Sequence, residues 1–185
     1  MSYELTGYKP INSNKGLDFS PSWFLQTRET FIRTGHYCEF RYGTKAFADF
    51  WDIQFDRCRN GMSFNGYTIT GDHYFFLNFY QLPNLNTSKA GTGRTIDFPD
   101  FYVAQYEWFH YLELCKRLRK NAALMKARGL GFSEMNASLT ANMYTVRDNS
   151  TTVITANLAK YVEDTLGKVW NALSFLNDKT DDGFS

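Results

Sequence analysis

The alternation of short apolar runs with helical stripes over residues 121–176 constrains the fold of this chain more than any other feature. An apolar run at 121–125 is followed by a stripe of apolar residues at helical spacing over 132–143. A β-branched run at 151–155 is followed by a second stripe over 158–176. This order predicts strand, helix, strand, helix. Such alternation indicates parallel strands joined by right-handed crossovers, the start of an α/β sheet.

Residues 1–83 are predicted to form a preceding α+β module of helices and an aromatic hairpin. Apolar spacing predicts a short helix over 21–33 and a longer helix over 44–59, capped at its first turn by Thr44. Turn-forming residues then flank the strand-like segment at 67–70 and precede the aromatic segment at 74–77. We therefore expect these two segments to pair as a hairpin that ends at residue 83.

A stretch rich in Gly, Ser, Thr and Asn, residues 84–96, separates this module from the rest of the chain. Its composition predicts a flexible loop or linker. A long amphipathic helix is expected to start near Pro99, and the cations at 116–120 would complement the dipole at its end. Residues 97–185 are therefore predicted to form a second unit, the start of the α/β domain.

Composition and charge exclude several classes of protein. Hydrophobic residues make up 43% of the chain and charged residues 21%, which excludes a disordered chain. Twenty Lys and Arg residues against nineteen Asp and Glu give a net charge of +1, so any contact with nucleic acid or membrane must be local. No stretch approaches the roughly 18 apolar residues of a membrane helix. Three widely spaced cysteines argue against a disulfide framework, so we expect a soluble protein of a reducing cytoplasm.

The clearest chemical signal is the segment 126–133, which reads Lys-Ala-Arg-Gly-Leu-Gly-Phe-Ser. In the standard phosphate loop, G-x-x-x-x-G-K-[ST], main-chain amides at a helix start hold phosphates, Lys neutralises them and Ser or Thr binds Mg²⁺. Gly131 and Ser133 match this pattern, whereas Lys126 replaces its first glycine and Phe132 replaces its lysine. What remains is a turn with two glycines before a helix, in which the cations Lys126 and Arg128 lie at the beginning of the loop and not at its end.

This form of the loop resembles the ATPase motif of the large terminase subunit of tailed bacteriophages, in which K-x-R or R-x-x-G-x-[ST] replaces the usual sequence. The resemblance extends over residues 97–176, and residues 153–157 are similar to the family's second strand. It implies a P-loop NTPase-type sheet and a DNA-packaging ATPase that uses ATP and Mg²⁺. It also implies double-stranded DNA, the portal protein and the small terminase subunit as partners of the complete protein, a homo-oligomer in the cytoplasm of the bacterial host.

The resemblance also implies a role for each residue of the loop. Lys126 and Arg128 would contact the β- and γ-phosphates as catalytic cations, the Ser133 hydroxyl would reach Mg²⁺, and Gln105 would contact adenine. The implied nucleotide-binding residues are Gln105, Lys126, Ala127, Arg128, Gly129, Leu130, Gly131, Phe132 and Ser133. No apolar strand ending in Asp-Glu, the Walker B element, precedes Ser185. The resemblance therefore implies the N-terminal part of a longer protein, inactive as an ATPase by itself.

Two other functions fit the same residues. In the first, the aromatic N-terminal half is a non-catalytic interaction module, and the glycine turn at 129–131 has only a structural role. In the second, the loop binds phosphate in another nucleotide-dependent protein, such as a helicase. A single Gln in a helix is also a common surface or packing residue, so Gln105 has a structural alternative of its own.

Overall fold

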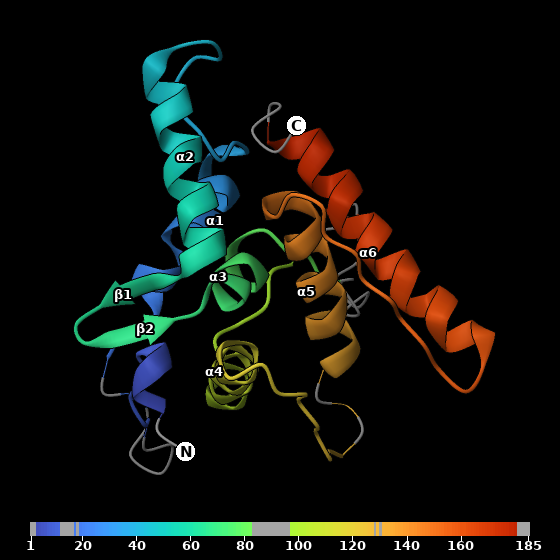
Figure 1. Ribbon diagram of the computed structural model, residues 1–185. Helices are drawn as coiled ribbons and strands as arrows, with labels where there is room; N and C mark the ends of the chain where they lie inside the picture. Colours follow the sequence, from blue (N-terminus) through green and yellow to red (C-terminus); the bar gives the residue numbers. More distant parts are fainter. Residues whose placement is uncertain are drawn as a thin grey trace, which may run out of the picture.

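The computed structural model describes residues 3–11, 17, 19–82, 97–127, 129 and 131–180, which form a mostly helical protein (Figure 1). The only sheet among these residues has two antiparallel strands, so the predicted parallel P-loop sheet is wrong. In chain order, the elements are the 3₁₀ helix η1 (Tyr3–Thr6), α1 (Ser22–Thr34), α2 (Lys45–Asn60), β1 (Met62–Phe64), β2 (Tyr67–Ile69), α3 (Gly71–Asn78), α4 (Val103–Arg117), α5 (Phe132–Val146) and α6 (Ala159–Lys179).

One end of each of the first two α-helices is set by a capping residue. The side chain of Thr44 accepts a hydrogen bond from the amide of Phe47 at 3.3 Å, which caps α2. Gly35 follows α1 in the left-handed conformation, with φ +80°, and its amide bonds to the carbonyl of Phe31. Thr44 therefore marks the start of α2, and Gly35 marks the end of α1.

The predicted hairpin between residues 67–70 and 74–77 is wrong, although the turn residues before it do form a turn. Asn65 and Gly66, with φ +50° and +76°, join β1 to β2 as an Asn-Gly turn does. Residues 71–78, however, form α3 instead of a strand. Thr70 caps this helix by accepting from the amide of His73, and all eight helical residues are buried. A short run that is apolar on every side carries no period, so it does not distinguish a strand from a buried helix.

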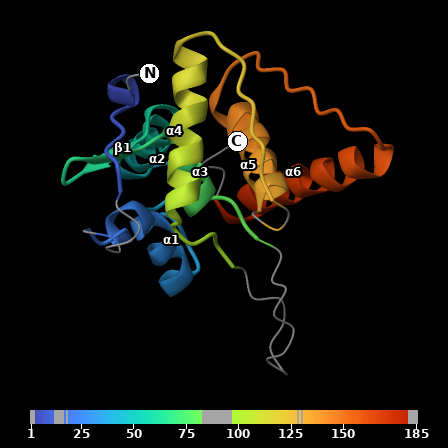
Figure 2. The same ribbon diagram turned by 90° about the horizontal axis from the view of Figure 1, so that it is seen from below.

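Helix α3 lies at the centre of the fold, in contact with α1, α2, α4 and α5 (Figures 1 and 2). Aromatic rings surround it and fill most of the core. Phe31, for example, packs edge-on against Phe175 with their centroids 5.5 Å apart, and Tyr37 stacks on Phe31 at 4.5 Å. Residues from both sides of the 84–96 loop therefore share one core. The loop itself lies outside the described residues, and the domain boundary stays a prediction.

A buried polar contact joins four of the helices. Asp72, in the first turn of α3, pairs with Lys116 of α4 and accepts a hydrogen bond from the Asn142 amide of α5 at 2.8 Å. The same amide donates to the carbonyl of Cys58 in α2 at 3.1 Å. The carboxylate is only 8% exposed and is neutralised by its partner, so this cluster fixes how the helices pack.

The two segments predicted as the parallel strands, 121–125 and 151–155, are open chain in the structure. Residues 121–125 are exposed, and the amide of Ala123 bonds to the Tyr111 hydroxyl at 3.4 Å instead of to a strand. Residues 151–155 run beside α5, with Val153 78% exposed. Within the described ranges neither segment has a neighbouring strand. A strand needs a partner for its main-chain groups, and β-branched composition alone does not provide one.

Membrane insertion finds no support in the helices that the structure describes, since none of them is both long and apolar enough to cross a bilayer.

Candidate functional site at the start of α5

The turn that leads into α5 is open and made of glycine. Gly129 and Gly131 have φ values of +85° and +68°, and a Cβ atom at either position would meet nothing within 4 Å. Gly131 is the N-cap of α5, and no side chain caps the helix. The amides of Glu134 and Met135 bond to the carbonyl of Gly131 at 3.0 and 3.1 Å, so the uncapped amides of the positive dipole end are those of residues 132 and 133. Of the predicted nucleotide-binding residues, Arg128 and Leu130 lie outside the described part of the chain.

Phe132, where the standard loop has lysine, anchors the helix start to the core. Its ring packs edge-on against Trp108 of α4, with the centroids 4.9 Å apart. The ammonium of Lys126 lies over the ring of Phe132, 5.7 Å from its centroid. The lysine side chain is thereby brought to the start of α5 from six residues earlier in the chain.

A half-buried ion pair and a hydrogen bond hold the first turn of α5 to two other parts of the chain. The Glu134 carboxylate accepts a hydrogen bond from the Tyr80 hydroxyl at 2.6 Å and pairs with the ammonium of Lys168 of α6 at 2.5 Å. Burial, followed by the hydrogen bond to Glu134, raises the pKa of Tyr80, so its hydroxyl stays protonated as a donor. Because Lys168 neutralises Glu134, the carboxylate adds little negative charge to the turn. No spacing in the sequence connects these three residues, and the sequence analysis missed them.

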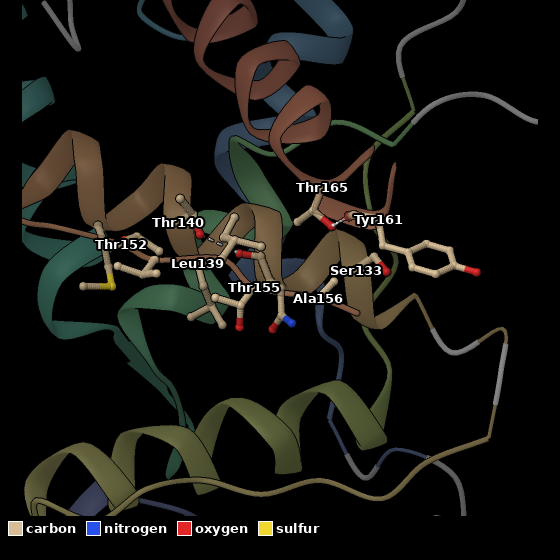
Figure 3. A pocket seen from close by; sticks show the side chains of 12 residues that line it. Ser133, Leu139, Thr140, Thr152, Thr155, Ala156, Tyr161 and Thr165 are labelled. Atoms are coloured by element: carbon tan, nitrogen blue, oxygen red, sulfur yellow. Dashed lines mark hydrogen bonds between the residues drawn. The ribbon is translucent and has the colours of Figure 1, made fainter. Parts of the chain in front are cut away.

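An open cavity of about 460 Å³ lies between α5, the segment 152–156 and the first turns of α6 (Figure 3). Ser133, the exposed second residue of α5, belongs both to its wall and to the glycine turn. The wall is uncharged and rich in hydroxyl groups. Its residues are Ser133, Asn136, Leu139, Thr140, Met143, Thr152, Val153, Ile154, Thr155, Ala156, Tyr161 and Thr165. Such a wall suits an uncharged ligand group that both donates and accepts hydrogen bonds.

Gln105 lies on α4, one helical turn before Trp108 and on the same side of the helix. Since Trp108 contacts Phe132, this side of α4 faces the start of α5. The Oε1 atom of Gln105 is buried and has no hydrogen-bond partner among the described residues. Gln105 is not part of the cavity wall. The structure therefore brings Gln105 to the same end of α5 as Lys126 and Ser133, but not into the cavity.

The Mg²⁺ ion that the resemblance implies would find few protein ligands at this site. Within the described ranges, no three His, Cys, Asp or Glu side chains gather closely enough to hold a metal ion. Ser133 offers one exposed hydroxyl oxygen. That donor suits Mg²⁺, which binds proteins through one or two oxygen ligands and completes its octahedron with phosphate oxygens and water.

Comparison of the chain with protein-family models, curated proteins and solved structures found no match in any of the three.

Proposed function

We propose that this chain binds the phosphates of ATP at the start of α5, as the nucleotide-binding part of a DNA-packaging ATPase of the large terminase type. The observation that carries the proposal is the uncapped helix start behind Gly129 and Gly131, with the Lys126 ammonium beside it. Free amides and the helix dipole attract an anion, and the lysine adds a full positive charge. The resemblance of residues 126–133 to the terminase motif supports ATP as that anion.

Each residue of the loop has a distinct role in this proposal. The amides of residues 131–133 hold phosphate oxygens, and the Ser133 hydroxyl provides one ligand of Mg²⁺. Lys126, a compact cation, neutralises the bound phosphates, whereas the planar guanidinium of Arg128 suits two oxygens of the transferring phosphoryl group. The unpartnered Oε1 of Gln105 is an acceptor that fits the amino group of adenine.

The proposal is tested by titrating the chain with ATP and Mg²⁺ while recording main-chain amide NMR shifts. We expect the largest shifts at residues 129–135. Lys126→Ala is expected to weaken binding about tenfold or more, since a hydrogen bond to a charged group contributes roughly 1.5–3 kcal/mol. Lys160→Ala, an exposed lysine on α6, is the matched control and should bind ATP normally. Resonances of 129–135 that stay unmoved at millimolar nucleotide would contradict the proposal.

A non-catalytic interaction module is the second candidate, but the observation that favours it lies in the C-terminal part of the chain and not in the aromatic N-terminal half. Large apolar side chains are exposed along 153–170: Val153 is 78%, Trp170 65%, Leu158 56% and Tyr161 54% exposed. Val153 and Tyr161 both line the cavity beside α5, and exposed apolar side chains that gather in this way are typical of protein–protein contacts. If this function holds, Trp170→Ser abolishes concentration-dependent self-association in sedimentation experiments, whereas Tyr102→Ser, at an equally exposed aromatic on another face, leaves it intact. Absence of association in the wild type would exclude a homotypic module.

A further inference from the structure

We infer that residues 116–127, the cationic strip, form a contact surface for the phosphate backbone of double-stranded DNA. The strip contains five of the twenty Lys and Arg residues and none of the nineteen Asp and Glu residues. The rest of the chain thus carries fifteen cations and nineteen anions, a net charge of −4. Every residue of the strip is exposed. A polyanion that is repelled by the rest of the surface is attracted here.

The helix dipole accounts for only part of this charge. Helix α4 ends at Arg117, so Arg119 and Lys120 lie beyond its last turn. Lys116 is engaged with Asp72, and Arg117 pairs with Glu113 at 2.8 Å. Arg119 and Lys120 form no ion pair and no side-chain hydrogen bond in the described part of the chain. These two cations are therefore available to a ligand.

Arg119 occupies a main-chain conformation that favours glycine. Its φ is +53°, and the amides of Arg119 and Lys120 bond back to the carbonyls of Lys116 and Cys115 at 3.1 and 2.9 Å. This is the helix-ending motif in which glycine is the usual left-handed residue. Compared with glycine, an arginine at this position makes the folded protein less stable but places a guanidinium at the surface. Such an outlier is explained if the charge itself is needed.

The path of the strip suits an extended polyanion. After α4 the chain turns and runs back beside that helix toward the start of α5, where Ala123 bonds to Tyr111 (Figure 2). The wall of the cavity beside α5 includes no residue of the strip, whose residues are all exposed. Recognition by charge along an open surface is typical of contacts with DNA phosphates, which fix position without reading sequence. An acidic polypeptide is the alternative ligand.

The inference rests on the proposed function, which is the reason for choosing duplex DNA as the ligand. It adds to that function the surface that contacts the DNA. The strip reaches the ATP site at Lys126, whose ammonium lies at the start of α5. A DNA contact on residues 119–120 and a phosphate site at 126–133 are then consecutive parts of one segment.

The test measures binding of the full chain to a short fluorescent duplex DNA between about 50 and 200 mM salt. We expect Arg119→Gly to bind DNA more weakly and to reduce the slope of log K against log salt by about 1, while its melting temperature stays equal or rises. Lys120→Gln should reduce the slope similarly. Lys160→Gln, an exposed lysine outside the strip, is the control and should change neither the affinity nor the slope.

Three results would overturn the inference: no binding of the duplex by the wild type, unchanged slopes in Arg119→Gly and Lys120→Gln, or displacement of the duplex by polyglutamate of equal charge. The last result would assign the strip to an acidic protein. ATP-induced amide shifts at 129–135, recorded on the same variants, separate this inference from the proposed function. DNA binding without such shifts supports the strip and contradicts the ATP site, whereas shifts without DNA binding do the reverse.

Discussion

Acidification is expected to destabilise this protein through one buried histidine. His73 of α3 has no exposed surface and stacks between the rings of Phe101 and Phe109, at centroid distances of 5.3 and 4.8 Å. Neither ring nitrogen has a hydrogen-bond partner among the described residues. Burial, with a smaller effect of nearby His110, lowers the pKa of His73 from 6.5 to about 3. The ring is therefore neutral in the folded protein at neutral pH.

The magnitude follows from proton linkage. Below pH 6.5 the unfolded chain protonates this histidine, whereas the folded chain protonates it only near pH 3. The unfolded state then binds more protons, so stability is complete above pH 6.5 and is lost as the pH falls toward 3. One pKa unit corresponds to about 1.4 kcal/mol, which gives a loss of about 2 kcal/mol by pH 5 and about 5 kcal/mol in total. Burial also lowers the pKa of His110, which adds a loss in the same direction.

The assay is urea unfolding of the wild type and His73→Phe at pH values of about 7.5 and 5. Phenylalanine keeps the stack between Phe101 and Phe109 and does not titrate, so the wild type should lose about 2 kcal/mol more than the variant on acidification. His36→Phe, at an exposed histidine, is the matched control and should keep the wild-type pH dependence. If the His73→Phe and wild-type curves run parallel between the two pH values, His73 is not the group responsible.

Two further predictions concern stability. Asn142→Leu removes the amide that donates to Asp72, so the free energy of unfolding in urea should fall by about 2–3 kcal/mol. Asn136→Leu, at a half-buried position on the same helix, should change it by about 0.5 kcal/mol or less, and equal losses would contradict the role of Asn142. Gly61→Ala places a Cβ 2.1 Å from a carbonyl oxygen of β2, at φ +89°, and should lower the melting temperature severely. Gly35→Ala, at φ +80° with nothing within 4 Å, should cost only about 1 kcal/mol, so similar thermal shifts would refute the clash.

Helices and turns whose ends are marked by capping or turn-forming residues could be predicted from the sequence. The Thr44 cap, the left-handed Gly35 and the Asn65–Gly66 turn act within a few residues, and the structure has each of them. The stripe that starts at Phe132 and the longer stripe of α6 are also helices, since their period of 3.6 residues is sustained over several turns. Such signals need no knowledge of the tertiary fold.

Elements that depend on distant partners could not be predicted. Residues 151–155 have strand composition, but pairing requires a neighbour, and none lies beside them in the described part of the chain. Residues 71–78 have the aromatic content of a strand, yet they lie at the centre of the helical core, where burial on all sides removes any period. Tertiary environment decided both segments against their local preference.

The candidate site shows the same division. Lys126, Gly131 and Ser133 were found from spacing within eight residues, and the structure places all three at the start of α5. The contact of Tyr80 and Lys168 with Glu134 joins residues far apart in sequence, and no pattern predicts it. The residues of the loop are close in sequence and could be found from their spacing, whereas the contacts that hold α5 in place join distant residues and could not.

The contacts that hold the first turn of α5 affect how a ligand could bind at the glycine turn before it. The helix behind it is fixed on one side by Phe132 against Trp108 and on the other by the contacts of Glu134 with Tyr80 and Lys168. The turn itself has two left-handed glycines and open space around them. A ligand that binds there need not order the helix, so the entropic cost of binding falls on the few residues of the turn. Binding residues are commonly found on loops that a rigid scaffold holds in place. The predicted parallel sheet, the expected scaffold of the proposed phosphate site, is absent from the described residues, and contacts with the aromatic core support the same turn instead.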